Sequence, residues 1–571
     1  AGERFRINAL AIGCNDAQTA GYGITKIKVF VTGTDPVNFV YGDESYTLQT
    51  DASSVTINAN NSVGAIRALE TLTQLVKPIS VLPSHIRTDV NGCASAAAVG
   101  LGPGFIIPSG PWNITDYPSY SWRGVLLDTG RNYIPIKSIL RTLDGMSATK
   151  LNVLHWHIVD ATSFPIVSET YPDLSKAAYS PLSIYSYADV QAIVYYATER
   201  GIRVIPEFDT PAHTNELAVS AELAPFVLCP NGGANKTNSY WPTCAEPPCG
   251  NINIADPAAA SAISELINEY TQMFPDSVFH LGGDEIETFC LNTSPEFTDI
   301  AFGKGTPVPQ IGTDIWTAGL AKVYQSYINT LLQTTSAAGK QTMHWEDIVL
   351  KDGVLLPNNT IIQVWNSWDN IASKNSLQKT LALDRYQIVD SNSDYYYLDG
   401  GSGEWLTDLG FGTGGNSWKE NYWTPYKAWQ RAYTHDPRTS PIDNTTDTTG
   451  TGYSTIDNVV QFPAGNLQSI IGGEVAVWTE KIGYPSLDVK LWPRAAAMGE
   501  ALWSADAFPD AGAKDFFEAL PRLKVLSDRL LSRGLSVETL QPAWCNTEQC
   551  STEFSGYSGN LSFGNSKPTY W

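Results

Sequence analysis

Residues 124–158 read GVLLDTGRNYIPIKSILRTLDGMSATKLNVLHWHI and contain two apolar runs separated by a helical pattern. The runs at Gly124–Asp128 and Leu151–Ile158 are short and apolar, as expected of buried strands. Between them, apolar residues recur at helical spacing over Ile136–Met146. A strand, a helix and a strand in this order predict two parallel strands joined by a crossover helix.

The same unit recurs along the chain. Six further runs have strand character, at Arg203–Glu207, Val278–Leu281, Thr342–Trp345, Ile361–Trp365, Tyr386–Ser391 and Ile470–Val475. Helical patterns fall between many of these runs, at Tyr187–Glu199, Pro257–Met273 and Gly312–Leu332. Eight strands alternating with helices predict an α/β fold, a (β/α)8 TIM barrel over residues 116–571.

Residues 1–115 have a different pattern. Alternating apolar and polar residues at 26–31, 45–48 and 54–57 predict short strands, and residues 62–72 have helical spacing. This part of the chain is predicted to be a small α+β domain in front of the barrel.

Composition and charge exclude several classes of protein. The chain has 571 residues, of which 36 are basic and 58 acidic, so its net charge is −22. Such a surface repels phosphate backbones, and we expect no nucleic-acid partner. No stretch approaches the roughly 18 apolar residues of a membrane helix, and we expect no membrane span.

Cysteines and glycosylation sequons favour a secreted protein whose signal peptide has been removed. The cysteines number eight and lack zinc-ribbon spacing, so disulfides fit them better than a metal. Among about a hundred possible connectivities we expect Cys229–Cys290, Cys545–Cys550, Cys244–Cys249 and Cys14–Cys93. Asn-x-Ser/Thr acceptors occur at Asn60, Asn113, Asn235, Asn292, Asn358, Asn444 and Asn560.

Asp284 and Glu285 are the residues that indicate a chemical function most specifically. They follow the fourth predicted strand after Gly282-Gly283, which lets the chain leave regular strand geometry and turn both carboxyl groups into one cleft. Two neighbouring carboxyls can be driven to different pKa values, as glycosidic bond cleavage requires. The alternative is structural, with Asp284 as an N-cap and Glu285 as a first-turn acid of the next helix.

His155 and His157 support a rival hypothesis. Residues i and i+2 share one face of a strand, and a His-x-His at a barrel strand end, joined by later His and Asp residues, also occurs in metal-dependent hydrolases. The other interpretation is that His213 and Asp160 hydrogen-bond and tune a nearby acid.

Aromatic residues at strand ends favour a sugar. Trp345, Trp365 and Trp478 stand at or just past three of these ends, and indole rings match the apolar face of a pyranose. Plain core packing is the alternative for each of them. Arg123, before the first strand, could present its guanidinium to vicinal hydroxyls.

HLGGDE at 280–285 resembles the H-x-G-G-D-E signature of the family 20 glycoside hydrolases, the β-N-acetylhexosaminidases. It is joined in the same order by WRGVLLDTGR from Trp122, KLNVLHWHIVD from Lys150, RVIPEFDTPAH from Arg203, YLD at 397–399 and GGEVAVWTE from Gly472. The first 115 residues resemble the α+β (zincin-like) domain of the family, and the composition is most like that of its secreted fungal members.

The resemblance implies a retaining mechanism in which the 2-acetamido group of the substrate is the nucleophile. Glu285 would be the general acid and base, Asp284 would orient the acetamido N–H, and Tyr397 would hold the carbonyl oxygen. Asp160 and His213 match the relay to the acid. The implied sugar-binding residues are Arg123 for the 3- and 4-hydroxyls, Asp399 and Glu480 for the 4- and 6-hydroxyls, and Trp345, Trp365 and Trp478 for the ring and acetamido group.

The resemblance also implies no metal and no other cofactor. The expected partners are amino-sugar oligosaccharides, either chitooligomers or glycan termini, and a second copy of the chain in a homodimer. A sugar-binding protein without activity is the third hypothesis, and the intact Asp284, Glu285 and Tyr397 argue against it.

Overall fold

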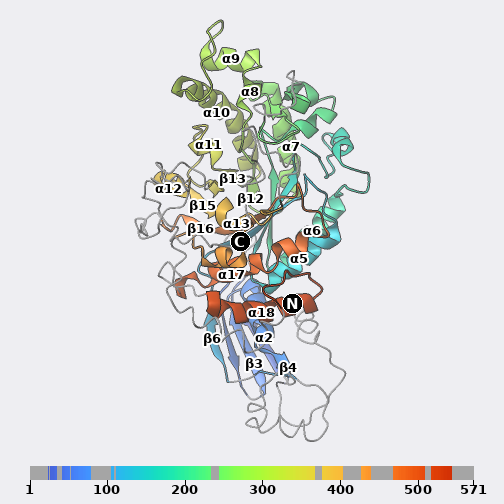
Figure 1. Cartoon of the computed structure of the whole chain (residues 1–571), viewed down its shortest axis with the longest axis vertical. Helices are drawn as coiled ribbons and strands as arrows, with labels where there is room; N and C mark the ends of the chain where they lie inside the picture. Colours follow the sequence, from blue (N-terminus) through green and yellow to red (C-terminus); the bar gives the residue numbers. More distant parts are fainter. Residues whose placement is uncertain are drawn as a thin grey trace.

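A computed structural model shows a closed barrel of eight parallel strands with a small mixed-sheet domain at one end (Figure 1). It describes residues 24, 26–34, 42–51, 53–78, 105–107, 111–232, 244–366, 376–402, 426–438, 467–507 and 516–542. No helix within these ranges is long and apolar enough to cross a bilayer.

The predicted (β/α)8 barrel is confirmed. Its strands are β7 (Trp122–Asp128), β8 (Val153–Val159), β9 (Arg203–Phe208), β12 (Val278–His280), β13 (Gln341–Trp345), β14 (Ile361–Val364), β15 (Gln387–Asp390) and β16 (Ile470–Val477). They pair in chain order, and β16 closes on β7 with Gly472 opposite Trp122. All eight correspond to the predicted strands within a few residues.

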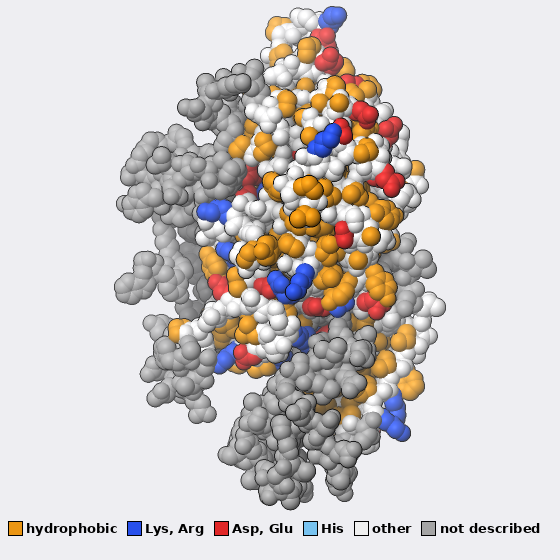
Figure 2. Space-filling model, turned by 90° about the vertical axis from the view of Figure 1, so that its right-hand side faces the viewer, with side chains coloured by type: hydrophobic (Ala, Val, Ile, Leu, Met, Phe, Trp, Pro, Cys, Tyr) orange, Lys and Arg blue, Asp and Glu red, His pale blue; other side chains and the backbone are white. Residues whose placement is uncertain are grey.

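Helices cover the outside of the barrel. The principal ones are α5 (Ile136–Ala148), α6 (Tyr187–Thr198), α7 (Pro257–Met273), α10 (Asp314–Ala337), α12 (Ser376–Ala382), α14 (Trp429–Thr434), α17 (Arg494–Trp503) and α18 (Phe516–Ser532). Shorter ones follow strand ends or fill loops, namely α8 (Thr288–Leu291), α9 (Pro295–Phe302), α11 (Asp347–Leu350), α13 (Ser393–Tyr396) and α16 (Leu487–Leu491). On the side of α5 and α6, hydrophobic side chains at the surface are interspersed with polar and charged ones (Figure 2).

The small domain has a four-stranded sheet and one helix. Its strands lie in the order β1 (Lys26–Val31), β3 (Ser54–Ala59), β2 (Tyr46–Thr50), β6 (Asn113–Asp116), and α2 (Ser62–Leu75) packs on the sheet. Two-stranded pieces are formed by β4 (Lys77–Pro78) with β5 (Phe105–Ile106), and by β10 (Val227–Leu228) with β11 (Asn251–Ile252) in the barrel loops. Figure 1 shows the domain below the barrel, beside α18.

The barrel interior is layered. The lowest layer, at the amino ends of the strands, takes one apolar residue from each strand: Trp122, Val153, Ile205, Val278, Met343, Ile361, Val389 and Ile471. Two positions further along β8 and β9, alternation places His155 and Glu207 inside the barrel, both fully buried. Aromatic residues close the carboxyl end, so a polar layer separates an apolar floor from an aromatic pocket.

Buried charges join the small domain to the amino end of the barrel. Arg67 of α2 donates to Glu44 at 2.7 Å and to the carbonyl oxygen of Gly201 at 2.8 Å. Glu44 in turn receives two hydrogen bonds of 2.8 Å from Arg123. Because these buried groups are paired across the boundary, the two parts pack as one unit.

Candidate active site

The turn after β12 carries the paired carboxylates. Gly282 and Gly283 have φ values of 67° and 103°, and a Cβ on Gly282 would overlap the carboxylate of Asp209. Glu285 itself has a φ of 50°. The chain therefore leaves strand geometry, as the Gly-Gly pair predicted. The structural alternative does not apply, since Thr288–Leu291 is the next helix and Glu287 is its N-cap residue.

A relay of side chains leads to Glu285. His213 Nε2 lies 3.4 Å from the Glu285 carboxylate, and His213 Nδ1 lies 3.5 Å from Asp160. Burial alone would lower the pKa of His213, but the charge of Asp160 and the hydrogen bonds to Asp160 and Glu285 together raise that pKa well above its usual value. Burial would likewise raise the pKa of Glu285, yet the hydrogen bond and charge of His213 lower it in the substrate-free site. The structure therefore brings the three residues together as the resemblance implied.

Asp284 has a different environment. Its pKa is raised well above the usual value, first by burial and then by the charge of Asp209. Burial also raises the pKa of Asp209 to about 6. Two carboxyls in contact share a proton more readily than they ionise together, so this pair differs in ionisation from Glu285.

Aromatic side chains form one cluster at the carboxyl end. Trp345, Trp365 and Tyr397 pack together with Trp478 against them. The rings of Trp365 and Tyr397 are stacked with centroids 6.4 Å apart, and Tyr397 lies 6.1 Å from Trp478. The indole N–H of Trp365 donates to Asp347 at 2.8 Å, so that ring is fixed by a buried carboxylate. The four residues expected to surround the acetamido group thus lie in one place.

The assignment of Arg123 to sugar binding is wrong. Arg123 lies at the amino end of β7, faces outward, and is fully buried. Its guanidinium donates to Glu44 and to the carbonyl oxygens of Tyr120 and Lys150. It is therefore a structural residue at the domain boundary, on the opposite end of the barrel from Glu285.

Arg131 is the arginine at the site. It follows the carboxyl end of β7 and lies 3.0 Å from Asp160, with its guanidinium over the ring of Trp478 at 5.1 Å. Its Nε and Nη1 atoms are buried and have no hydrogen-bond partner among the described residues. Nη1 lies 3.7 Å from Asp128, and donors without a hydrogen-bond partner at this end of the barrel match the hydroxyl recognition that we expected of Arg123.

Acidic side chains surround this arginine. Glu246 lies 3.1 Å from Arg131, and it was not predicted from the sequence. Burial raises the pKa of Glu480 well above its usual value, and the charge of Glu246 raises it further. Burial also raises the pKa of Asp399 to about 6, and its Oδ1 has no hydrogen-bond partner in the described part of the chain. These carboxyls are suited to accept hydrogen bonds from sugar hydroxyls.

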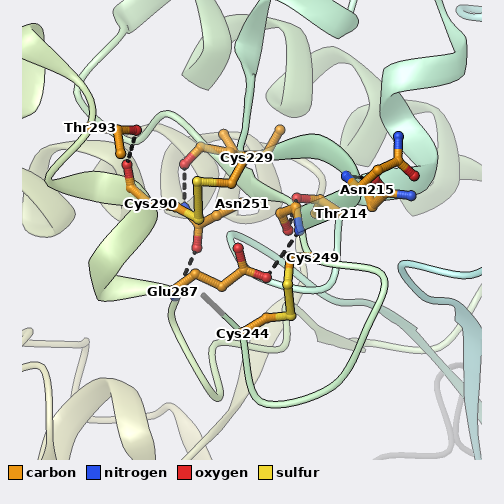
Figure 3. Close-up of a disulfide and its surroundings, with 12 residues drawn as sticks. Thr214, Asn215, Cys229, Cys244, Cys249, Asn251, Glu287, Cys290 and Thr293 are labelled. Carbon is orange, nitrogen blue, oxygen red and sulfur yellow. Dashed lines mark hydrogen bonds between the residues drawn. A yellow bond between two sulfur atoms is a disulfide. The ribbon is translucent and has the colours of Figure 1, made fainter. Parts of the chain in front are cut away.

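Two disulfides shape the loops around the site (Figure 3). Cys229–Cys290 joins the loop after β9 to α8, and Cys244–Cys249 closes the short loop that carries Glu246, both as predicted. The carboxylate of Glu287 accepts a hydrogen bond of 3.0 Å from the backbone N–H of Gly250 and anchors that loop. Cys14, Cys93, Cys545 and Cys550 lie outside the described residues.

The His-x-His pair of β8 is engaged by carboxylates. His157 contacts Glu207 through Nδ1 at 2.6 Å and Asp160 through Nε2 at 3.0 Å. His155 Nδ1 lies 2.7 Å from Glu474. These three nitrogens have carboxylate partners, as a structural role of the pair requires. Nε2 of His155 lies 3.1 Å from Glu207, and His155, Glu207 and His280 form a group that could also hold a metal ion.

Comparison with known proteins identifies the same family along the chain. The model of the glycosyl hydrolase family 20 catalytic domain matches residues 120–506, and a model described as beta-acetyl hexosaminidase like matches residues 6–75. A probable beta-hexosaminidase of Arthroderma benhamiae is 31% identical, and the alignment covers 92% of this chain and 78% of that protein.

Two further relatives give the same result. A chitooligosaccharidolytic beta-N-acetylglucosaminidase of Ostrinia furnacalis is 31% identical, with 88% of this chain and 74% of that protein covered. Among solved structures, the chitobiase of Flavobacterium johnsoniae superposes with a TM-score of 0.65 at 25% identity, covering 93% of this chain and 67% of that chain.

Proposed function

Because the chain belongs to glycosyl hydrolase family 20, we infer that it is an exo-acting β-N-acetylhexosaminidase that removes terminal β-linked N-acetylglucosamine. The observation that carries this function is the meeting of two carboxyl groups in different environments, Asp284 and Glu285, with the aromatic cluster. The acid relay and the donors of Arg131 complete a pocket with a reacting end and a hydroxyl-binding end.

Each group has a step in a retaining, substrate-assisted mechanism. Glu285 protonates the glycosidic oxygen while the acetamido oxygen of the substrate attacks the anomeric carbon. The bond to the leaving group breaks and a cyclic oxazolinium ion forms. Glu285 then takes a proton from water, which attacks the same carbon and opens the ring with net retention.

Asp284 and Tyr397 act on the acetamido group. With the shared proton on Asp209, Asp284 accepts a hydrogen bond from its N–H, which orients the group and stabilises the positive charge that develops on it. The Tyr397 hydroxyl donates to the carbonyl oxygen, and its buried position beside Trp365 fixes that donor. An oriented nucleophile inside the substrate explains why the protein needs no carboxylate nucleophile of its own.

A chromogenic assay tests the function. We expect hydrolysis of p-nitrophenyl N-acetyl-β-glucosaminide between pH 3 and 8, highest in the acid range, and strong inhibition by the thiazoline analogue of the cyclic intermediate. NMR of the first product should show the β-anomer. Absence of turnover in folded protein, or turnover lost on chelation and restored by zinc, would overturn the inference.

We propose chitooligomers as the natural substrates, with glycan termini as the alternative. The relative from Ostrinia furnacalis is named for chitooligosaccharides, and the acids around Arg131 suit an uncharged, hydroxyl-rich sugar. Acceptance of N-acetylgalactosamine follows if Asp399 and Glu480 tolerate an axial 4-hydroxyl. Competition between chitobiose and a biantennary glycan, with kcat/KM compared, distinguishes the two sources.

We also propose that the protein is secreted and glycosylated. Asn60, Asn113 and Asn358 are exposed, while Asn292 is half-buried. The sequons at Asn235, Asn444 and Asn560 lie outside the described residues. A mass shift on enzymatic removal of N-glycans from the protein in culture medium would support this, and an unglycosylated intracellular product would contradict it.

A homodimer is the expected assembly. Light scattering coupled to size exclusion tests it, because a homodimer has twice the 62.2 kDa mass of the chain. A mass equal to that of one chain would reject the expectation.

A further inference from the structure

The polar layer beneath the site contains a buried carboxylate with no assigned role. Glu207 lies on β9, faces the barrel interior, and is fully buried. A buried charge is costly unless its oxygens are paired, so its partners indicate what it stabilises. The two oxygens of Glu207 have different partners, which lie on opposite sides of the site.

One oxygen contacts the acid relay. Oε2 of Glu207 lies 2.6 Å from Nδ1 of His157, and Nε2 of the same ring lies 3.0 Å from Asp160. Asp160 is the residue that contacts His213, which in turn contacts Glu285. A continuous series of contacts therefore runs from the centre of the barrel to the general acid.

The other oxygen contacts the aromatic cluster. The indole N–H of Trp345 donates to Oε1 of Glu207 at 2.8 Å. Trp345 is fully buried, and its ring lies 6.0 Å from Trp478 in the cluster that surrounds the acetamido position. The Nδ1 atom of His280 lies 3.1 Å from the same oxygen but accepts a hydrogen bond from Gly282, so Trp345 is the donor on this side.

Charges alternate along the relay. The charged groups that act most strongly on His157 are Glu207, Asp160 and Asp128. Burial alone would lower the pKa of His157, but the charge of Glu207 and the hydrogen bond to Asp160 raise it well above its usual value. The rings of His157 and Trp478 form a T-shaped contact with their centroids 5.0 Å apart.

We propose that Glu207 is a positioning residue that fixes the acid relay with one oxygen and the acetamido-binding aromatic cluster with the other. The proposal rests on the substrate-assisted mechanism, in which proton donation and acetamido attack occur in one step. Both reacting ends must be placed at the same time, and a shared rigid anchor between them serves this need. Glu207 is fully buried beneath the site, so it acts through its neighbours, His157 on the acid side and Trp345 on the acetamido side. Oε2 also lies 3.1 Å from Nε2 of His155, which belongs to neither side.

The test replaces the carboxylate of Glu207 and measures the acid relay and the acetamido-binding aromatic cluster separately. In Glu207→Gln, one carboxylate oxygen becomes an amide NH2 that only donates, so the side chain can no longer accept hydrogen bonds from both His157 and Trp345. The acid side is read as the ratio of kcat/KM for a 2,4-dinitrophenyl and a methyl N-acetylglucosaminide, because only the poor leaving group needs the acid. We expect a loss about 10-fold larger for the methyl glycoside.

The acetamido side is read by the thiazoline, which needs the aromatic cluster but no leaving group. We expect its Ki to rise about 10-fold. Glu474→Gln is the matched control, since Glu474 is also fully buried in the barrel interior but reaches Glu207 through His155 and not through His157 or Trp345. It should lower stability without changing either readout.

The outcomes separate this proposal from the assigned function. Wild-type turnover blocked by the thiazoline supports the function whatever the variants do. The double role is overturned by a Glu207→Gln enzyme in which the leaving-group ratio, the thiazoline Ki or both keep the wild-type value. It is also overturned if Glu474→Gln changes these two readouts as much as Glu207→Gln does. If Glu207→Gln does not fold, His157→Gln takes its place as the test of the acid relay. We then expect the leaving-group ratio to change while the thiazoline Ki does not, and an unchanged ratio rejects the role of Glu207 in the acid relay.

Discussion

The guanidinium of Arg131 lies 3.0 Å from the carboxylate of Asp160. Asp160 also contacts His213, so the residue with free donors for sugar hydroxyls is directly joined to the relay of the general acid. Burial would raise the pKa of Asp160, but the charges of Arg131 and His213 hold it well below its usual range. The hydroxyl-binding end and the reacting end of the pocket therefore share one ionised carboxylate.

Replacement of Arg131 should damage substrate recognition. In Arg131→Ala we expect kcat/KM on the chromogenic substrate to fall about 10- to 100-fold, because hydrogen bonds to a charged group contribute about 1.5–3 kcal/mol. Arg123→Ala is the control, since that arginine binds Glu44 at the domain boundary. It should lower the melting temperature by several degrees with kcat/KM retained in the folded fraction. The reverse pattern would restore Arg123 as the sugar-binding arginine.

The sequence contained the information needed to separate these arginines. Periodicity located all eight strands, and side chains at their carboxyl ends form the pocket of a β/α barrel. Arg123 precedes β7 and Arg131 follows it, so only Arg131 stands at the functional end. Both arginines lie in the motif WRGVLLDTGR, and the match to the family motif assigned hydroxyl binding to Arg123 instead of Arg131.

The contact of Glu246 with Arg131 could not be predicted from the sequence, for a different reason. It lies in a loop between β9 and β12 whose path is set by tertiary contacts. These are the Cys244–Cys249 bridge and the hydrogen bond from Gly250 to Glu287. No periodic pattern indicates which loop residue will reach Arg131 under such constraints. Strand-end residues are predictable because the barrel fixes their direction, whereas loop residues are not.

Opening the Cys244–Cys249 loop should weaken substrate binding. Without the bridge, Glu246 is less firmly held against Arg131, so we expect the double variant Cys244→Ser, Cys249→Ser to raise KM several-fold with a smaller change in kcat. Glu246→Gln in the intact loop should reproduce the rise in KM. Steady-state kinetics measure both effects, and an unchanged KM in the two variants would show that this loop does not contact substrate.

The relay predicts a pH shift. His213 lowers the pKa of Glu285 against the effect of burial, so His213→Asn should leave burial dominant and raise that pKa. Because Glu285 must be protonated to act as an acid, the limb where kcat/KM falls with rising pH should move to higher pH. The rate should also fall, by about 10- to 100-fold.

A pH–rate profile between pH 3 and 8 measures the shift. His435→Asn is the matched control, since His435 is also buried against a carboxylate, Asp390, at 2.7 Å. Its profile should keep the wild-type limb. If the limb of His213→Asn stays in place, Glu285 does not take its pKa from His213.

His155 predicts how stability changes with pH. Burial would lower its pKa, but the charges of Glu474 and Glu207 outweigh this and raise the pKa from 6.5 to about 9. The folded pKa exceeds the unfolded one, so this stabilisation is fully present below pH 6.5 and is lost as pH rises through about 9. Thermal unfolding should therefore show a melting temperature that declines by several degrees between pH 7 and 9.5. Glu474→Gln removes the strongest charge partner of His155 and should flatten that decline, whereas a decline as steep as in the wild type would assign it to other groups.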